Sequence, residues 1–149
     1  MKSLQPQFGK ILALDYGKSK IGAAISDETR SMVFGRGRID CKNGLNAFFE
    51  KLRMWCTEDD IATIVIGLPY NQEGKETAQT RRIRNFAKKL EHFLNASRLA
   101  ANIVFEDESF SSFEATEHLT QIGFKAKKSK EHEDELAAVL VLKRYIKIR

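Results

Sequence analysis

Acidic residues end two of the segments that the sequence predicts as strands. Asp15 follows the apolar run 11–14 (Ile-Leu-Ala-Leu), which has the pattern of a strand buried on both faces. Glu106, Asp107 and Glu108 end a second such segment, in NIVFEDE. Carboxylates at these places emerge at the carboxyl edge of an open α/β sheet, where such folds bind ligands. Taken singly, each acid could also start a turn or stabilise the N-terminus of a helix.

A third acidic place opens the terminal helix, which the sequence predicts over 131–147. Asp134 lies four residues before Ala138 and seven before Val141, so it shares their apolar stripe. Glu135 begins a second, mostly apolar stripe. The spacing therefore does not choose between Asp134 and Glu135.

The remaining pattern alternates strand and helix signals. A hairpin-rich start followed by β-α-β-α predicts an α/β fold, with a mixed sheet of about five strands and helices on its faces. The expected strands lie in a hairpin over 11–26 and at 32–39, 61–69 and 102–106, and the expected helices at 44–56, 77–94, 111–122 and 131–147.

Length and composition predict one soluble domain over 1–149. The formal charge of +5 favours a polyanionic partner. No apolar run approaches the roughly 20 residues of a membrane span, and the first residues lack the apolar core of a signal peptide. Cys41 and Cys56 form no metal-binding pattern, so we expect reduced thiols in a cytoplasmic protein.

Carboxylates that a fold brings together repel one another and need a cation. Hard oxygen ligands select Mg²⁺ or Mn²⁺. A carboxylate-bound magnesium beside a basic surface is typical of phosphoryl transfer or phosphodiester hydrolysis.

Four segments resemble the motifs of one family, in the family's order, from about Ile11 to Ile146. These segments are LDYGKSKIGAAISD, IVIGLPYNQEGKETAQTRRIRNFAKKL, DESFSSFEA and DELAAVLVL. The family is YqgF/RuvX, the pre-16S rRNA nucleases, also described as Holliday-junction-resolvase-like. The resemblance implies a ribonuclease H-like fold, with a mixed five-stranded sheet and helices on both faces.

The resemblance also implies a catalytic and metal site of Asp15, Glu108 and Asp134, with Asp107 as a further candidate ligand. The chain departs from the family pattern at two basic positions. Lys20 stands where the family usually has arginine, which keeps the charge but loses bidentate contact with phosphate. Ser109 stands at a second arginine position and removes a cation beside the acids.

Basic residues outside the acidic motifs are candidates for contact with a phosphate backbone. A run of charge can equally be a solvated face. The candidates are Lys20, Arg81, Arg82, Arg84, Lys127 and Lys128.

The sequence thus predicts a metal-dependent endonuclease that hydrolyses structured RNA, maturing the 5′ end of precursor 16S rRNA, and that contacts ribosomal particles. Two alternatives stay open: a resolvase of branched DNA, and a ribosome-assembly protein with little catalysis, which the serine at 109 favours. An actin-like ATPase would need a second phosphate loop and a second domain. We expect no membrane contact, and either a monomer or a homodimer.

Overall fold

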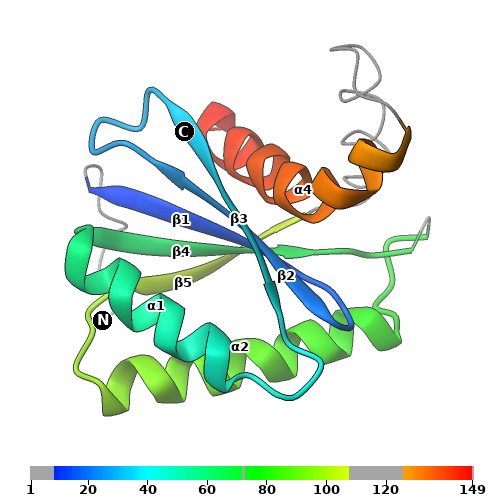
Figure 1. Ribbon diagram of the computed structural model, residues 1–149. Helices are drawn as coiled ribbons and strands as arrows, with labels where there is room; N and C mark the ends of the chain where they lie inside the picture. The colour runs from blue at the N-terminus through cyan, green and yellow to red at the C-terminus, as the bar shows by residue number, and fades with distance from the viewer. Residues whose placement is uncertain (1–8, 72, 108–125, 149) are drawn as a thin grey trace.

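The computed structural model describes residues 9–71, 73–107 and 126–148, and it contains a mixed sheet with helices on both faces (Figure 1). The sheet has five strands, as the sequence predicted, in the order β3-β2-β1-β4-β5. The strands are β1 (Lys10–Tyr16), β2 (Lys20–Ser26), β3 (Val33–Asp40), β4 (Ile61–Leu68) and β5 (Asn102–Asp107). The helices are α1 (Asn46–Glu58), α2 (Ala78–Ala96) and α4 (Ala126–Ile148).

One helix differs from the prediction, and another cannot be compared with it. Helix α4 begins at Ala126 rather than near 131, because the polar segment before the apolar stripe is helical too. The helix predicted over 111–122 lies outside the described residues, as do the side chains of 126–132 and 148.

The carboxyl ends of three strands meet at one edge of the sheet. β1 pairs in parallel with β4, and β4 pairs in parallel with β5. β2 returns antiparallel to β1 through a tight turn in which the Gly17 N–H donates to the Lys20 carbonyl at 2.8 Å. The acids that end β1 and β5 therefore lie at the same edge, as expected for an open α/β sheet.

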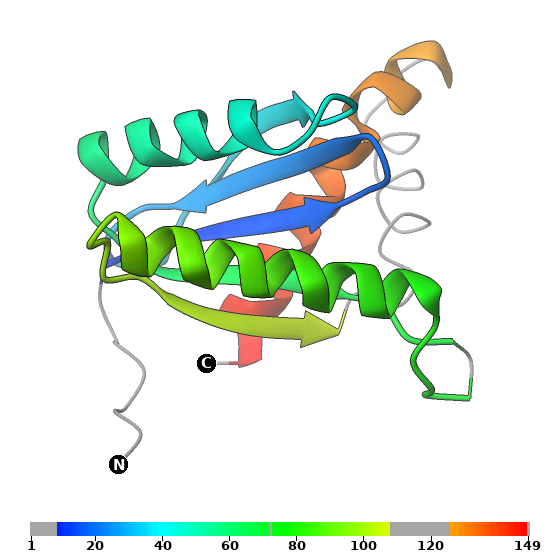
Figure 2. The same cartoon turned by 90° about the horizontal axis from the view of Figure 1, so that it is seen from below.

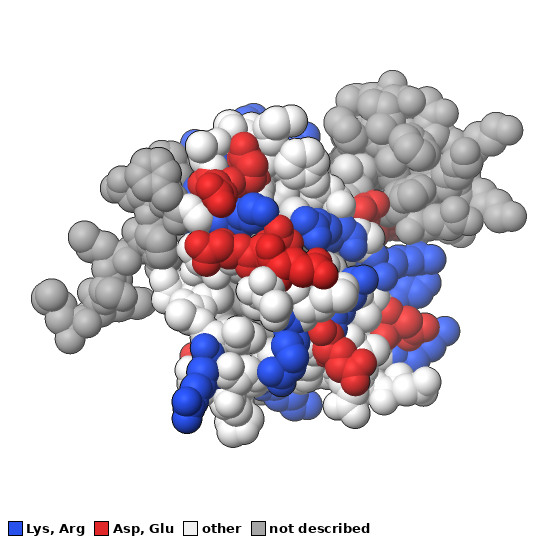
Figure 3. All heavy atoms as spheres, turned by 60° about the vertical axis from the view of Figure 1, so that its left-hand side comes forward, with Lys and Arg blue, Asp and Glu red and all other residues white. Residues whose placement is uncertain are grey.

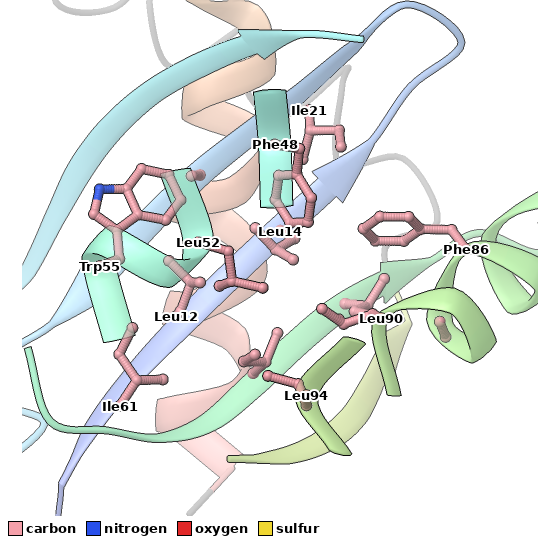
Figure 4. Close-up of a cluster of buried hydrophobic side chains, with 14 of the residues drawn as sticks. Leu12, Leu14, Ile21, Phe48, Leu52, Trp55, Ile61, Phe86, Leu90 and Leu94 are labelled. Carbon is pink, nitrogen blue, oxygen red and sulfur yellow. The ribbon is translucent and has the colours of Figure 1, made fainter. Parts of the chain in front are cut away.

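Side chains of the central strands alternate between two separate cores. Leu12 and Leu14 pack with α1 and α2 on one face, whereas Ile11 and Ala13 pack with α4 on the other. Figure 2 views the sheet from the α1 and α2 side. The core under these helices contains large side chains such as Phe48, which Figure 4 shows among leucines of β1 and α2.

The start of α2 is attached to the end of β1 beside the acidic edge. Thr77 caps this helix, and its side chain and that of Thr80 form a reciprocal capping box. The Gln79 side-chain amide donates to the Tyr16 carbonyl at 3.0 Å. Within the described ranges, no helix has the length and apolar character needed to cross a membrane.

Candidate active site at the carboxyl edge of the sheet

Asp15 lies on the face of the sheet that α4 covers. The alternation of β1 places Ile11 and Ala13 on this face, so Asp15, two residues further along, shares it. Its side chain is partly buried. This strand geometry directs the carboxylate of Asp15 toward α4 rather than toward α1 and α2.

Asp134 reaches the same place because two glycines of the neighbouring strands let α4 approach the sheet. Gly22 is the register partner of Asp15 in β2. A Cβ atom at Gly22 would overlap the backbone carbonyl of Asp134, and a Cβ at Gly35 would overlap the Glu135 carboxylate. The helix backbone thus lies directly on the strand next to Asp15, which a side chain at Gly22 would prevent.

The structure separates the roles of Asp134 and Glu135, which the sequence pattern could not. The Glu135 carboxylate accepts the Gly37 N–H of β3 at 2.6 Å, so it holds α4 to the sheet. The Asp134 carboxylate lies 3.8 Å from the guanidinium of Arg38, and about 30% of its side chain is exposed. The Glu135 carboxylate is thus engaged with the backbone of β3, whereas the Asp134 carboxylate is partly exposed.

The acids of β5 divide between the two faces of the sheet. Val104 packs with the α4 core, so alternation places Glu106 on the α4 face and Asp107 on the opposite face. The register agrees, because Asp107 pairs with Leu68, which belongs to the α1 and α2 core. Asp107, the further candidate ligand, is therefore not brought to Asp15. Glu108 lies outside the described residues.

The predicted basic residues fall into two groups. Lys20 lies on the α4 face, two residues before Gly22 on β2. Arg81, Arg82 and Arg84 lie on α2, on the other side of the sheet. The side chains of Lys127 and Lys128 are outside the described part.

Two of the three arginines on α2 already hold protein partners. Arg84 forms an ion pair with Glu76 at 2.8 Å and lies over the Phe105 ring at 5.4 Å. The guanidinium of Arg82 donates two hydrogen bonds to the side-chain oxygen (Oε1) of Gln79. Arg81 is exposed and is the best placed of the three to meet a phosphate.

Two groups near the site stay protonated at neutral pH. Burial raises the pKa of the Tyr16 hydroxyl, and the neighbouring Cys41 raises it further, against the opposing charge of Arg82. Burial also raises the pKa of the Cys41 thiol, and the negative charges of Asp40 and Asp134 add to the shift. Both shifts favour the neutral forms of these two groups.

A site of hard oxygen donors fits Mg²⁺ or Mn²⁺. Among the described residues, no group of three or more His, Cys, Asp or Glu side chains is arranged to hold a metal ion. Asp15 and Asp134 supply two carboxylates, so a complete site would need a third from elsewhere.

Arg38 and Glu106 lie on the same face as Asp15, and neither was among the predicted site residues, although Glu106 was one of the acids expected at this edge. The alternation of β5 from Val104 could have placed Glu106 on the face of Asp15. No comparable signal existed for Arg38, because a bulge in β3 changes the alternation there.

Comparisons with known proteins place the chain in a family. The model of the RuvX family, described as Holliday junction resolvase, matches residues 9–148. The chain belongs to the RuvX family. A relative from Maridesulfovibrio salexigens, named "Putative pre-16S rRNA nuclease", is 32% identical over 92% of this chain and 97% of its own length. Relatives of the same name from Ruminiclostridium cellulolyticum and Koribacter versatilis are each 34% identical, over 92% and 100% of this chain and 93% and 94% of their own lengths.

This membership confirms the family predicted from the four motifs, and with it the ribonuclease H-like fold class and the nuclease class of function.

Proposed function

We propose that this RuvX-family chain is a metal-dependent endonuclease whose cation is held by Asp15, Asp134 and Glu108. One observation carries the proposal: the backbone of Asp134 lies on Gly22, the register partner of Asp15, so two acids far apart in sequence meet at one sheet edge. Carboxylates held close to one another repel in the absence of a cation, and such arrangements are concentrated at functional sites. Glu108 enters from its match to the family motif.

A bound Mg²⁺ or Mn²⁺ would supply Lewis-acid stabilisation of the phosphate and activation of water. The protein's own contribution is to hold the acids in place. The hydrogen bond from Gly37 to Glu135 fixes the start of the sheet-bound part of α4. The contact between the Asp134 backbone and Gly22 fixes the distance of α4 from β2. Lys20, on the same face, is placed to meet a phosphate of the substrate.

We propose precursor 16S rRNA as the substrate, with cleavage that matures its 5′ end. The names of the relatives support this substrate, and the charge of +5 supports a polyanion. The described surface is not uniformly basic: Figure 3 shows acidic and basic side chains interspersed on one face. Local cations near the acids should therefore guide the phosphate backbone more than the net charge does.

Cleavage of branched DNA is the second candidate, and the family's description favours it. The deciding experiment incubates purified protein with precursor rRNA and with a four-way DNA junction, each with Mg²⁺ or Mn²⁺. We expect cleavage of the RNA. Cleavage of the junction alone would establish the resolvase function. Binding without cleavage, with both metals, would contradict the nuclease and favour an assembly protein.

The wider setting is part of the same proposal. We propose a single domain over 1–149 that acts in the cytoplasm on precursor ribosomal particles, as a monomer or a homodimer. The free thiols of Cys41 and Cys56 agree with a reducing compartment.

A further inference from the structure

A cation from the edge strand β3 lies beside the two candidate acids. The register pairs Arg38 with Gly22, and Gly22 with Asp15, so Arg38 and Asp15 lie in one row across three strands. Neighbouring strands are about 4.8 Å apart, which puts the two backbones about 10 Å from each other. An arginine side chain can cover much of that distance. One guanidinium nitrogen of Arg38 is 3.8 Å from the Asp134 carboxylate.

A bulge in β3 turns Arg38 to this face. Ala24 pairs with Gly35, but Gly22, only two residues earlier, pairs with Arg38, so β3 contains one extra residue. Gly37 takes the left-handed conformation, with φ of 77°, that such a bulge requires. In a regular strand, position 38 would face away from Gly35. The extra residue brings both onto the α4 face.

The same bulge is tied to the helix that carries Asp134. An extra residue leaves a backbone N–H outside the strand ladder, and here the Gly37 N–H is bound by the Glu135 carboxylate at 2.6 Å. The bulge therefore does two things: it turns Arg38 to the α4 face, and it binds α4 through Glu135. This coupling gives Arg38 a fixed place relative to Asp134.

We propose that Arg38 contacts a phosphate of the nucleic-acid substrate next to the acidic site. This inference rests on the proposed nuclease function. Two carboxylates repel a phosphodiester, and a guanidinium beside them offsets that repulsion while binding phosphate through two N–H groups. About 34% of the Arg38 side chain is exposed, so a substrate can reach it.

The alternative is that Arg38 only neutralises Asp134. The pair is a loose one, because the 3.8 Å separation exceeds that of a hydrogen bond. A guanidinium dedicated to one carboxylate normally binds it through short, paired hydrogen bonds. The geometry therefore leaves donors of Arg38 for a second anion.

The test measures binding without cleavage. Affinity for a labelled single-stranded RNA and for a four-way DNA junction is measured by fluorescence anisotropy in EDTA, over a range of KCl concentrations. Arg38→Ala should weaken binding about tenfold, the effect of one charge-assisted contact. It should also reduce the log–log salt slope by about 0.7 to 0.9. Arg38→Lys should keep the slope of the unmodified protein and lose part of the affinity.

Arg36→Ala is the matched control. Arg36 lies two residues away on the same strand, but it pairs with Asp59 at 3.3 Å instead of Asp134. Arg36→Ala removes the same charge from the protein as Arg38→Ala does. An equal loss of affinity in the two variants would therefore show a general charge effect and overturn the proposal. Thermal unfolding shows whether each variant is folded. If Arg38→Ala is not folded, the affinity lost by Arg38→Lys provides the test.

The remaining outcomes are distinct. If Arg38 is only a counter-ion of Asp134, Arg38→Ala should leave the salt slope unchanged and should bind Mg²⁺ more tightly in calorimetry. That result would overturn the proposal. Failure of the unmodified protein to bind either nucleic-acid probe would overturn it too. If binding depends on Arg38 but no substrate is cleaved, the phosphate contact stands and the nuclease function fails. If the unmodified protein cleaves RNA and Arg38→Ala binds that RNA equally well, the nuclease function stands and the phosphate contact of Arg38 fails.

Discussion

The two faces of the sheet bury their helices in different ways. Under α1 and α2, large side chains fill the space, and Phe86 stacks on Tyr16 with ring centroids 4.4 Å apart. Under the first sheet-bound turns of α4, Ala13 of β1 and Ala24 of β2 share a core with Ala138, and the helix backbone touches the strand at Gly22, whereas larger side chains such as Tyr145 fill this core further along the helix. Large side chains bury more apolar area, whereas small residues allow closer approach.

This difference explains why the acids lie on the α4 face. A helix separated from the sheet by leucines and phenylalanines would hold a short aspartate far from β1. A helix whose backbone rests on Gly22 brings Asp134 next to the register partner of Asp15. Both faces bury an apolar core, but the candidate chemistry lies on the α4 face, so variants on the two faces should separate stability from cleavage.

Asp15→Asn should give the largest effect on cleavage. The substitution keeps the shape of the side chain but removes a charge from the metal site, so cleavage should fall by orders of magnitude, because the metal supplies several kcal/mol of transition-state stabilisation. Folding should be retained, since relief of carboxylate repulsion is stabilising in the absence of metal. The measurements are cleavage rate and denaturant unfolding in EDTA.

Asp107→Asn sharpens this prediction. Asp107 ends β5 on the opposite face of the sheet, so its amide variant should cleave nearly as fast as the unmodified protein. Equal losses at Asp15 and Asp107 would contradict the assignment of the site to one face. A well-folded Asp15→Asn protein that still cleaves at full rate would contradict the metal site itself.

Phe86→Ala should give the largest effect on stability. Phe86 is almost completely buried and contacts the rings of Tyr16 and Phe48. Truncating a buried phenylalanine typically costs about 3–5 kcal/mol in the free energy of unfolding. Urea denaturation measures this loss, and cleavage at a temperature where the variant is folded should change little.

The exposed Met54 of α1 provides the control for this face. Its side chain is 40% exposed, so Met54→Ala should change stability by less than about 1 kcal/mol. A comparable loss in both variants would show that the core under α1 and α2 does not carry the stability that its packing indicates.

Gly22→Ala should affect both properties at once, to a smaller extent. The added methyl group would overlap the Asp134 backbone, so α4 must move away from β2. Overpacking of this kind costs about 1–3 kcal/mol. Cleavage should fall too, because Asp134 moves with the helix. Loss of stability with unchanged cleavage would show that Asp134 does not act at this place.

The sequence predicted the mixed sheet and the shared edge of the acids that end β1 and β5, because these follow from local alternation. The apolar run before Asp15 and the acids of the last strand indicated a shared edge without any knowledge of distant contacts. The different contacts of Asp134 and Glu135 depend instead on how far the glycines let α4 approach, which is a tertiary property. Arg38 was out of reach for a similar reason, because one extra residue in β3 reverses the face that its position would otherwise take.

The smallest expected effect concerns the turn between β2 and β3, which precedes the bulge on the edge strand. Asp27 accepts backbone N–H groups from Ser31 at 2.8 Å and Met32 at 3.1 Å. The hydrogen bond from Met32 is the main cause that lowers the pKa of Asp27 to about 2, and those from Ser31 and Thr29 add to it against partial desolvation.

Because its pKa is lowered in the folded state, the charged Asp27 stabilises the fold at pH values above the ordinary pKa of an aspartate. This contribution is lost as the pH falls toward about 2. Asp27→Asn cannot titrate, so the stability gap between it and the unmodified protein should narrow as the pH falls from about 5 to about 2. Urea midpoints measure the gap, with Asp60→Asn as the control for a general change of charge. A gap independent of pH would show that the charge of Asp27 does not hold this turn. Cleavage at neutral pH should be unchanged, because the turn joins the ends of β2 and β3 that lie away from Gly22 and Arg38.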